Sequence, residues 1–332
     1  MKIGLIVPYF GKLPCTFQLW LKSAIINNKI DFHLIIDQQI DYKLPPHIIV
    51  HKMSFESLQQ KIKQSLNTMI KSPYKLCDYK PTYGYLFKDI IKDYDYWGYS
   101  DIDLVYGNLT KFINDRRIFG YYDKIFDLGH LAFYKNNQKI NEMFKSKLNG
   151  IVYWNYILNS EIIWVFDEAY SDGMIGINGI FKKKGYELFA NRNYFSDINP
   201  RYIGFFDEWN HPEFNNFYSI IDGTLKQTFL IDDKIREKEL IYMHYQKRKI
   251  KEIELKNNQI LLLPAHWPPC SSYKEAIDML ISENYRDKQI NIAFRKWSKK
   301  RAIKKIYKFT KELFLYRESR SYLLYYIKKY FK

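Results

Sequence analysis

Two aspartates, Asp101 and Asp103, stand one residue apart at the end of the aromatic run in YDYWGYSDIDLVYG. Two carboxylates this close repel each other unless a cation lies between or beside them. A hard divalent ion such as Mg²⁺ or Mn²⁺ suits such oxygen ligands and would also bridge a diphosphate. Asp93-Tyr94-Asp95 repeats the spacing but precedes the apolar run. The position after that run and before Gly107-Asn108 therefore favours Asp101 and Asp103 as a metal site.

A histidine far along the chain offers a further ligand. In ELIYMHYQKRK, a short apolar segment predicts a strand that presents His244, and Lys247 and Arg248 follow it. Histidine is a good ligand for a divalent cation, and the adjacent cations could neutralise phosphate oxygens. A lone histidine in an aromatic strand is more often structural. It is the combination of His244 with the distant aspartate pair that favours a metal role.

A second acidic pair, Asp167 and Glu168, follows an apolar run and precedes a glycine-bearing loop in WVFDEAYSDGMIGINGIF. A carboxylate in such a place could act as general base on an acceptor hydroxyl. A solvated turn, with one carboxylate capping the next helix, explains the pattern equally well. A near copy, FFDEWNHPEF, makes Asp207 and Glu208 the alternative acid pair.

The elements that must position these groups alternate between strand and helix. Continuous apolar runs predict strands at Lys2–Pro8, Phe32–Ile36, Ile48–Met53, Lys124–Leu128 and His130–Tyr134. Helices are expected at Phe17–Asn27, from Ser54 to Ile70, through LCDYKPTYGYLFKDII to about Asp93, and at Gln138–Leu148. This alternation predicts an α/β layered fold with crossover connections. In open sheets of that kind ligands lie at the carboxyl ends of strands, where Pro8, Asp37 and Asp101 fall.

The charge of the chain is concentrated in one segment. The 332 residues carry a formal charge of +16, and Arg295–Lys332 alone has 14 Lys and Arg against 2 Glu. Because the rest of the chain is near neutral, no nucleic-acid partner is expected. The three scattered cysteines predict neither a disulfide framework nor a zinc site, which favours a reducing cytoplasm. The N-terminus predicts a first strand, since its apolar run ends in Pro8 without a cleavage signal, and no run reaches membrane-spanning length.

The basic tail predicts an amphipathic helix. Between Arg295 and Arg317, four lysines fall on one helical face opposite apolar and aromatic residues: Lys300, Lys304, Lys308 and Lys311. A cationic face against an apolar face is the profile of a helix lying on an anionic membrane surface. The alternative is a helix whose apolar side packs on the catalytic domain while its lysines are solvated.

Taken together, WGYSDIDLVYGNL, DLGHLAFYKN, FDE with its glycine loop and IYMHYQKRK resemble the bacterial capsule and cell-surface polysaccharide glycosyltransferases of the GT-A fold. VPYFGKLP and LCDYKPTYG are also similar to that group, so the resemblance covers Met1–Lys249. It implies a Rossmann-like mixed sheet flanked by helices in a catalytic domain over 1–290. The donor half would be about 1–110 and the acceptor half about 111–260, with the basic tail at 291–332.

The resemblance also implies an activity and a place. A hexose or N-acetylhexosamine would move from a nucleotide sugar, expected to be a UDP-sugar, to a capsule, O-antigen or similar lipid-linked glycan. The enzyme would work in the cytoplasm, peripheral at the inner face of the bacterial membrane. Metal-dependent phosphotransfer or nucleotidyl transfer is the alternative enzyme class, and a non-catalytic binding module driven by the basic tail is the other alternative.

Residue roles follow from the same resemblance. Mn²⁺ or Mg²⁺ would be held by Asp101, Asp103 and His244. Asp101 would also contact the donor diphosphate. Asp167 or Glu168 would be the base if the reaction inverts. The other implied contacts are Pro8, Tyr9 and Asp37 with the nucleoside, Lys80 and Lys247 with the diphosphate or donor sugar, and Gly129 and His130 with the donor sugar or acceptor.

Overall fold

The computed structural model describes residues 1–41, 43–147, 150–168, 176–207, 216–246, 248–255 and 259–282. Two compact units divide the chain: the first holds Met1–Leu104 and Leu109–Asn191, and the second holds Val105–Asn108 and the chain from Arg192 onward. Lys247, Glu208 and the tail predicted at 291–332 lie outside the described residues. The division into a donor half and an acceptor half stays a prediction.

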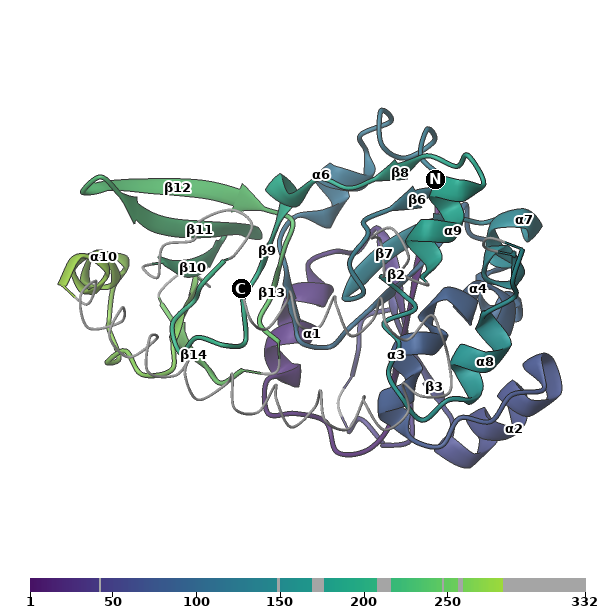
Figure 1. Ribbon diagram of the computed structural model, residues 1–332. Helices are drawn as coiled ribbons and strands as arrows, with labels where there is room; N and C mark the ends of the chain where they lie inside the picture. The colour runs from purple at the N-terminus through teal and green to yellow at the C-terminus, as the bar shows by residue number, and fades with distance from the viewer. Residues whose placement is uncertain are drawn as a thin grey trace. The chain divides into compact units, whose positions relative to one another are not determined.

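The first unit is built on a seven-stranded sheet in the order β3-β2-β1-β4-β7-β6-β8 (Figure 1). The central strands run parallel, β1 with β2 and β4, and β2 with β3, whereas β7 is antiparallel to β4 and β6. The predicted mixed α/β fold is therefore confirmed. The strands are β1 Ile3–Tyr9, β2 Ile30–Ile36, β3 Ile48–Lys52, β4 Tyr96–Ser100, β6 Lys124–Ile125, β7 Leu131–Lys135 and β8 Leu188–Phe189.

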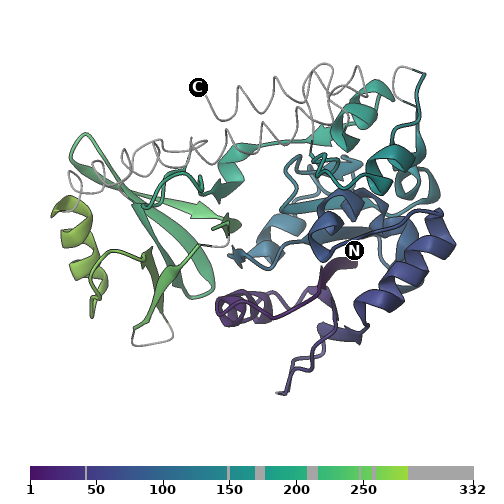
Figure 2. The same cartoon turned by 60° about the horizontal axis from the view of Figure 1, so that its bottom comes forward.

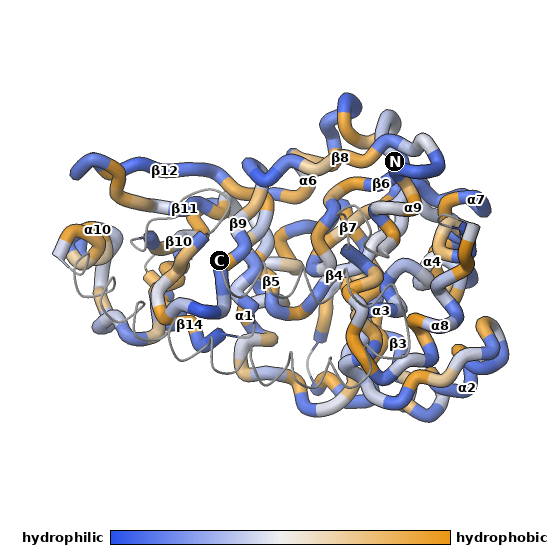
Figure 3. Tube along the Cα trace, in the orientation of Figure 1, coloured by the Kyte–Doolittle hydropathy of each residue, from blue (hydrophilic) through white to orange (hydrophobic). Residues whose placement is uncertain are grey.

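Helices cover both faces of this sheet, and the strand sequences reflect that cover. Figure 1 shows α1 (Phe17–Ile25) on one side and α4 (Tyr83–Leu86), α8 (Trp154–Asn159) and α9 (Ile177–Lys183) on the other. A strand buried on both faces reads as a continuous apolar run, as the first residues of β1 do, and all five residues of β4 are buried. Figure 3 shows hydrophobic colour along much of β7.

The start of the second helix follows the sequence signal closely. α2 (Phe55–Leu66) has Ser54 as its N-cap, whose side chain accepts the Ser57 N–H at 3.1 Å. The helix ends earlier than the predicted Ile70 because Asn67 takes a left-handed backbone with φ of 52°. Asparagine is one of the residues that tolerates this conformation at a helix end.

Two further predicted helices are wrong in length. The helix expected up to about Asp93 is broken into α3 (Leu76–Tyr79), a 3₁₀ turn, α4 and α5 (Lys88–Ile91). The 3₁₀ turn contains Pro81, which offers no backbone N–H. The helix expected at Gln138–Leu148 ends early, as α7 (Gln138–Asn141) followed by a 3₁₀ turn at Met143–Lys145. A further short helix is α6 (Leu109–Ile113).

The connections of the sheet define where a ligand would bind. From β1 the chain crosses to β2 on one side, and after β3 it returns to β4 on the other side of β1. The order of the strands therefore reverses between β1 and β4. Open α/β sheets bind their ligands outside the carboxyl ends of the strands at such a switch point.

The second unit is mainly antiparallel and was not predicted beyond the strand at His244. A three-stranded sheet has the order β5 (Leu104–Tyr106), β13 (Tyr242–His244), β9 (Phe195–Asp197). A five-stranded sheet has the order β12-β11-β10-β15-β14, and Figure 2 shows α10 (Tyr273–Ser282), in yellow-green, beside it. Ala276 and Leu280 of this helix belong to one hydrophobic cluster with Phe217 and Leu261 of the sheet. These strands are β10 Asn216–Ile221, β11 Thr224–Ile231, β12 Lys234–Leu240, β14 Ile250–Glu254 and β15 Ile260–Pro264.

Within the described ranges, no helix combines the length and the apolar character that crossing a membrane requires.

Candidate functional site

Several predicted site residues lie along one edge of the seven-stranded sheet. Pro8 and Tyr9 end β1, Asp37 directly follows β2, and Asp101 directly follows β4. His130 lies at the same edge because β7 runs antiparallel and begins at the next residue. The Asp101 N–H donates to the His130 carbonyl at 2.9 Å, which ties the two segments together. The structure thus brings these groups to the switch-point edge of the sheet.

Asp37 and Tyr9 shape the β1 side of this edge. Both carboxylate oxygens of Asp37 accept the Gly11 N–H, at 3.2 and 3.1 Å, and Gly11 has a φ of +96° that favours glycine. Asp37 therefore anchors the loop that follows β1. Burial raises the pKa of Tyr9, and the nearby charge of Asp103 raises it further. Tyr9 and Asp103 accordingly lie within electrostatic reach of each other.

The two aspartates of the central pair differ in exposure. The Asp101 side chain is 35% exposed, whereas Asp103 is buried. The pair with the same spacing, Asp93 and Asp95, lies at the other end of β4, where Asp95 accepts the Lys2 N–H at 2.7 Å. Of the two aspartate pairs, Asp101 and Asp103 therefore lie at the carboxyl edge of the sheet, as the sequence predicted.

Lys80 is buried behind Asp101. Its Nζ donates to the Gly129 carbonyl at 2.6 Å, pairs with Asp101 Oδ1 at 2.8 Å and lies 3.5 Å from Asp167 Oδ2. Burial alone would lower the pKa of Lys80, but the charges of Asp101 and Asp167 outweigh it and raise the pKa well above its usual value. Lys80 is therefore an ammonium ion that donates to the Gly129 carbonyl and pairs with two carboxylates.

This geometry changes the expected role of Lys80. The resemblance implies a direct contact with the diphosphate or donor sugar, but an ammonium has only three donors. Because Lys80 donates to Gly129 and its charge is paired with Asp101 and Asp167, the arrangement favours a role in holding Asp101. The sequence offered no signal for these partners because they come from three other segments.

The second acidic pair lies next to Lys80 and Gly129. Asp167 is 3% exposed, and burial raises its pKa to about 8 against the opposing charge of Lys80. Glu168 is partly exposed and its Oε1 accepts the Gly129 N–H at 3.0 Å. A Cβ on residue 129 would lie 2.9 Å from Glu168 Oε1 and closer still to Asp167. Glycine at this position therefore lets the backbone approach both acids.

The raised pKa of Asp167 predicts a pH effect on stability. Its unfolded pKa is near 3.8 and its folded pKa is about 8, so the folded protein binds the proton more tightly. The resulting contribution to stability is complete below about pH 4 and is lost as the pH rises through 8. Asp167→Asn is expected to remove this loss, which is at most about 1.4 kcal/mol per pH unit. Denaturant unfolding of both proteins across this range measures the difference, and parallel pH profiles would contradict the raised pKa.

A buried ion pair, Lys75 with Asp78, positions the segment that leads into Asp167. The two side chains are 2.7 Å apart and 4% and 0% exposed. Asp78 also accepts the backbone N–H groups of Trp164 and Phe166, at 3.0 and 2.9 Å, and Lys75 donates to the Ile162 carbonyl. The sequence did not predict these contacts, because the two segments that they join are more than 80 residues apart.

Asn178 supports the acids from another side. Its side chain is buried in α9, and its Nδ2 donates to the carbonyls of Asp127 and Glu168. Asp127 lies two residues after the end of β6 and is itself buried. Asn178 thus ties the acidic segment to the same edge of the sheet.

In the second unit, His244 lies at the end of β13 beside Asp197 at the end of β9. Nδ1 of His244 is 2.8 Å from Asp197 Oδ1. Arg248 donates to the carbonyls of Ile203, Gly204 and Asn199, and burial lowers its pKa to about 10. This arrangement gives Arg248 an internal role and not a phosphate contact.

The alternative acid pair is divided by the limits of the described chain. Asp207 is fully buried in the second unit and forms a β-bridge with Ile198. Glu208 lies outside the described residues. The burial of Asp207 makes it a weaker candidate base than the partly exposed Glu168.

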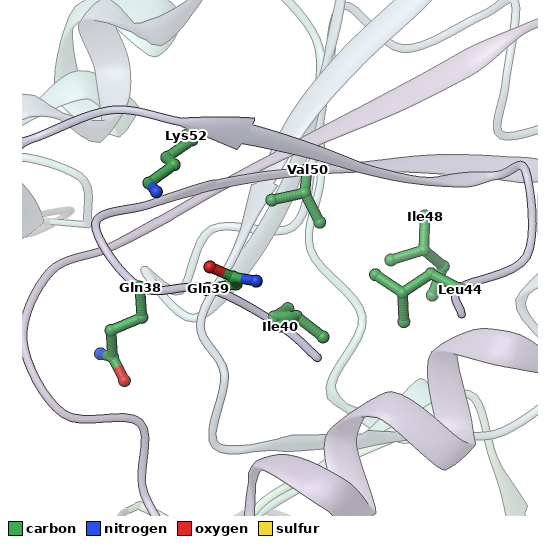
Figure 4. Close-up of a pocket in the computed structure, with 7 residues that line it drawn as sticks. All are labelled: Gln38, Gln39, Ile40, Leu44, Ile48, Val50 and Lys52. Carbon is green, nitrogen blue, oxygen red and sulfur yellow. The ribbon is translucent and has the colours of Figure 1, made fainter. Parts of the chain in front are cut away.

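A pocket of about 390 Å³ lies between β3 and the connection that leads into it from β2 (Figure 4). It is lined by Gln38, Gln39, Ile40, Leu44, Ile48, Val50 and Lys52. Figure 4 shows Ile40, Leu44 and Ile48 near one another at one end and Lys52 with Gln38 at the other. Because Gln38 directly follows Asp37, the pocket continues the edge on which the nucleoside was expected.

Comparison with protein families gives one match. Residues 5–269 match DUF6625, which is described as a family of unknown function. The match spans every residue predicted above as part of the site. A search of curated proteins found no match.

Proposed function

The chain belongs to the DUF6625 family, and we propose that it is a metal-dependent glycosyltransferase of the GT-A fold. It would move a hexose or N-acetylhexosamine from a nucleotide sugar, with UDP as the expected nucleotide, to a glycan acceptor. The observation that carries the proposal is the gathering of Tyr9, Asp37, Asp101 and Asp103 at the switch-point edge of a mixed α/β sheet. That edge is where open α/β sheets bind nucleotides.

The donor would lie across the ends of β1, β2 and β4. Pro8, Tyr9 and Asp37 are in place to border the nucleoside, and Asp101 and Asp103 to face the diphosphate. Gly129 and His130, on the other side of Asp101, would border the donor sugar or the acceptor. The support is positional, since all these residues share one edge of the sheet.

The chemistry of Asp101 and Asp103 fits a hard divalent ion such as Mn²⁺ or Mg²⁺, because both offer carboxylate oxygens. When bound, the ion would supply Lewis-acid stabilisation of the nucleoside diphosphate as it leaves. Lys80 holds one oxygen of Asp101 at 2.8 Å, so it fixes the orientation of that carboxylate. A carboxylate has about four lone-pair sites, which leaves acceptor capacity for the cation.

His244 remains part of the proposal as the third ligand. Its support is the resemblance, in which the aspartate pair occurs together with a later strand that presents a histidine. Lys247 keeps its proposed contact with the diphosphate or donor sugar on sequence grounds alone.

If the reaction inverts configuration, Glu168 is the better candidate base for the acceptor hydroxyl. Asp167 is buried and its carboxylate pairs with Lys80, whereas Glu168 is partly exposed and so is open to an acceptor hydroxyl. A retaining reaction would need no such base.

The acceptor and the location follow from the same resemblance. We propose a surface glycan, such as capsule, O-antigen or a similar lipid-linked glycan, at the cytoplasmic face of a bacterial membrane. The basic segment at 291–332 would provide the attraction to anionic lipid, at about 1 kcal/mol per basic residue near the surface.

Ligand-induced stabilisation tests the proposal. A panel of nucleotide sugars is added with Mn²⁺, and the thermal midpoint is recorded for the native protein, Asp101→Asn and the exposed control Asp93→Asn. Binding of the right donor raises the midpoint of the native and control proteins, because a ligand that binds only the folded state stabilises it. A panel in which no nucleotide sugar raises the midpoint, or in which Asp101→Asn responds as strongly as the native protein, would overturn the proposal.

A further inference from the structure

Asp197 and His244 form a partly buried pair in the second unit. β9 and β13 run parallel with these two residues in register at the ends of both strands. Asp197 Oδ1 is 2.8 Å from His244 Nδ1 and 2.8 Å from Nε2 of the Gln246 side chain. The carboxylate and imidazole side chains are only 17% and 12% exposed, so the contact is largely shielded from water.

This contact fixes which nitrogen of the imidazole carries the proton. An ionised carboxylate can only accept hydrogen bonds, so the facing nitrogen, Nδ1, must donate. The amide of Gln246 donates to the same oxygen, which therefore accepts from both side chains. In the neutral ring the lone pair then lies on Nε2, the form of histidine that can bind a metal ion.

The backbone holds both partners in place. The Ile198 N–H donates to the His244 carbonyl at 2.9 Å, directly beside the side-chain contact. Arg248 donates to the Gly204 carbonyl at 3.0 Å and so fastens the segment that follows Asp197. The imidazole therefore has little freedom to turn away from Asp197.

We propose that Asp197 is a positioning residue that keeps His244 in the Nδ1-protonated tautomer and orients its Nε2 toward a divalent cation. The carboxylate also increases the basicity of the ring, as partners of metal-bound histidines do in general. The cation is the one in the proposed function, so this part of the inference rests on that proposal. The tautomer is a property of the two side chains alone.

Nitrogen NMR of the full chain tests the tautomer without any metal or substrate. The protein has seven histidines, and the His244 signals are identified by their loss in His244→Gln. We expect the native spectrum to show His244 protonated on Nδ1, and Asp197→Ala to shift it toward Nε2 protonation. A native His244 that is protonated on Nε2 would overturn the inference.

Mn²⁺ affinity, measured by electron paramagnetic resonance of the free ion, tests the positioning role. Asp197→Ala is expected to weaken binding by roughly 10- to 100-fold, the usual effect of losing a histidine's outer partner. Asp197→Asn keeps the size of the side chain and should cause a smaller loss, and it decides the matter if the alanine variant does not fold. The exposed Asp278→Asn in α10 serves as the matched control with unchanged affinity.

The outcomes separate the two proposals. If His244→Ala weakens Mn²⁺ binding and neither Asp197 variant does, the positioning role is overturned while the metal site stands. If neither His244→Ala nor the Asp197 variants change the affinity, the positioning role and the assignment of His244 both fail. Nucleotide-sugar binding, tested through Asp101→Asn, is then judged separately.

Discussion

Asp103→Asn is expected to lower donor turnover by roughly 10²- to 10³-fold, since loss of the cation removes several kcal/mol of charge stabilisation from the departing diphosphate. Asparagine keeps the shape of the side chain but loses the charge that attracts the cation. Turnover is measured as nucleoside diphosphate released from a nucleotide sugar at saturating Mn²⁺. The expected loss is largest at low Mn²⁺ concentration, because a weakened site is partly refilled when the ion is abundant.

The chain contains its own control for this substitution. Asp93 has the same spacing to Asp95 as Asp101 has to Asp103, but it is exposed at the opposite end of β4. Asp93→Asn should therefore turn over the donor as the native protein does. Equal turnover by Asp103→Asn and Asp93→Asn would contradict the assignment of Asp103 as a metal ligand.

Asp78→Ala is expected to lower the free energy of unfolding by about 3–5 kcal/mol, the range for breaking a buried ion pair. The substitution leaves the Lys75 ammonium buried and the backbone N–H groups of Trp164 and Phe166 without their acceptor. Denaturant unfolding measures the change. The exposed Asp89→Ala in α5 is the control and should stay within about 0.5 kcal/mol of the native protein.

A double-mutant cycle refines this second prediction. Lys75→Met combined with Asp78→Ala removes both charges, so the double variant should be less destabilised than the sum of the two single variants. Part of the loss should persist, because the two backbone N–H groups remain unsatisfied. Additive single effects would show that Lys75 and Asp78 do not interact as the structure has them.

The strands and strand-end residues of the first unit were predictable because they depend on local sequence. β1, β2 and β3 are apolar runs closed by proline or polar residues, and parallel strands bring such ends to one edge. The positions of Tyr9, Asp37 and Asp101 follow from that. The partners of Lys80 were not predictable, since a lysine in a short helix carries no signal for contacts with Gly129 or Asp167.

The second unit illustrates a signal that was present but not used. Asp222-Gly223 joins β10 to β11, and Asp232-Asp233 joins β11 to β12, each as a two-residue connection with positive φ. Such connections between alternating segments are the strongest local sign of a β-hairpin. Figure 3 shows the hydrophilic character of β12, and a strand of this kind contains no apolar run that would predict it. The pairing of Asp197 with His244 depends on strand register and had no local signal.

The central claim is tested most directly by identifying the products of the full chain with nucleotide sugars and Mn²⁺. The reaction mixtures are separated by chromatography and their products are identified by mass spectrometry, with and without a chelator. The account predicts release of a nucleoside diphosphate and transfer of the sugar, lost with the chelator and restored by Mn²⁺. A phosphorylated or nucleotidylated acceptor, or no turnover of any nucleotide sugar in the presence of Mn²⁺, would contradict it.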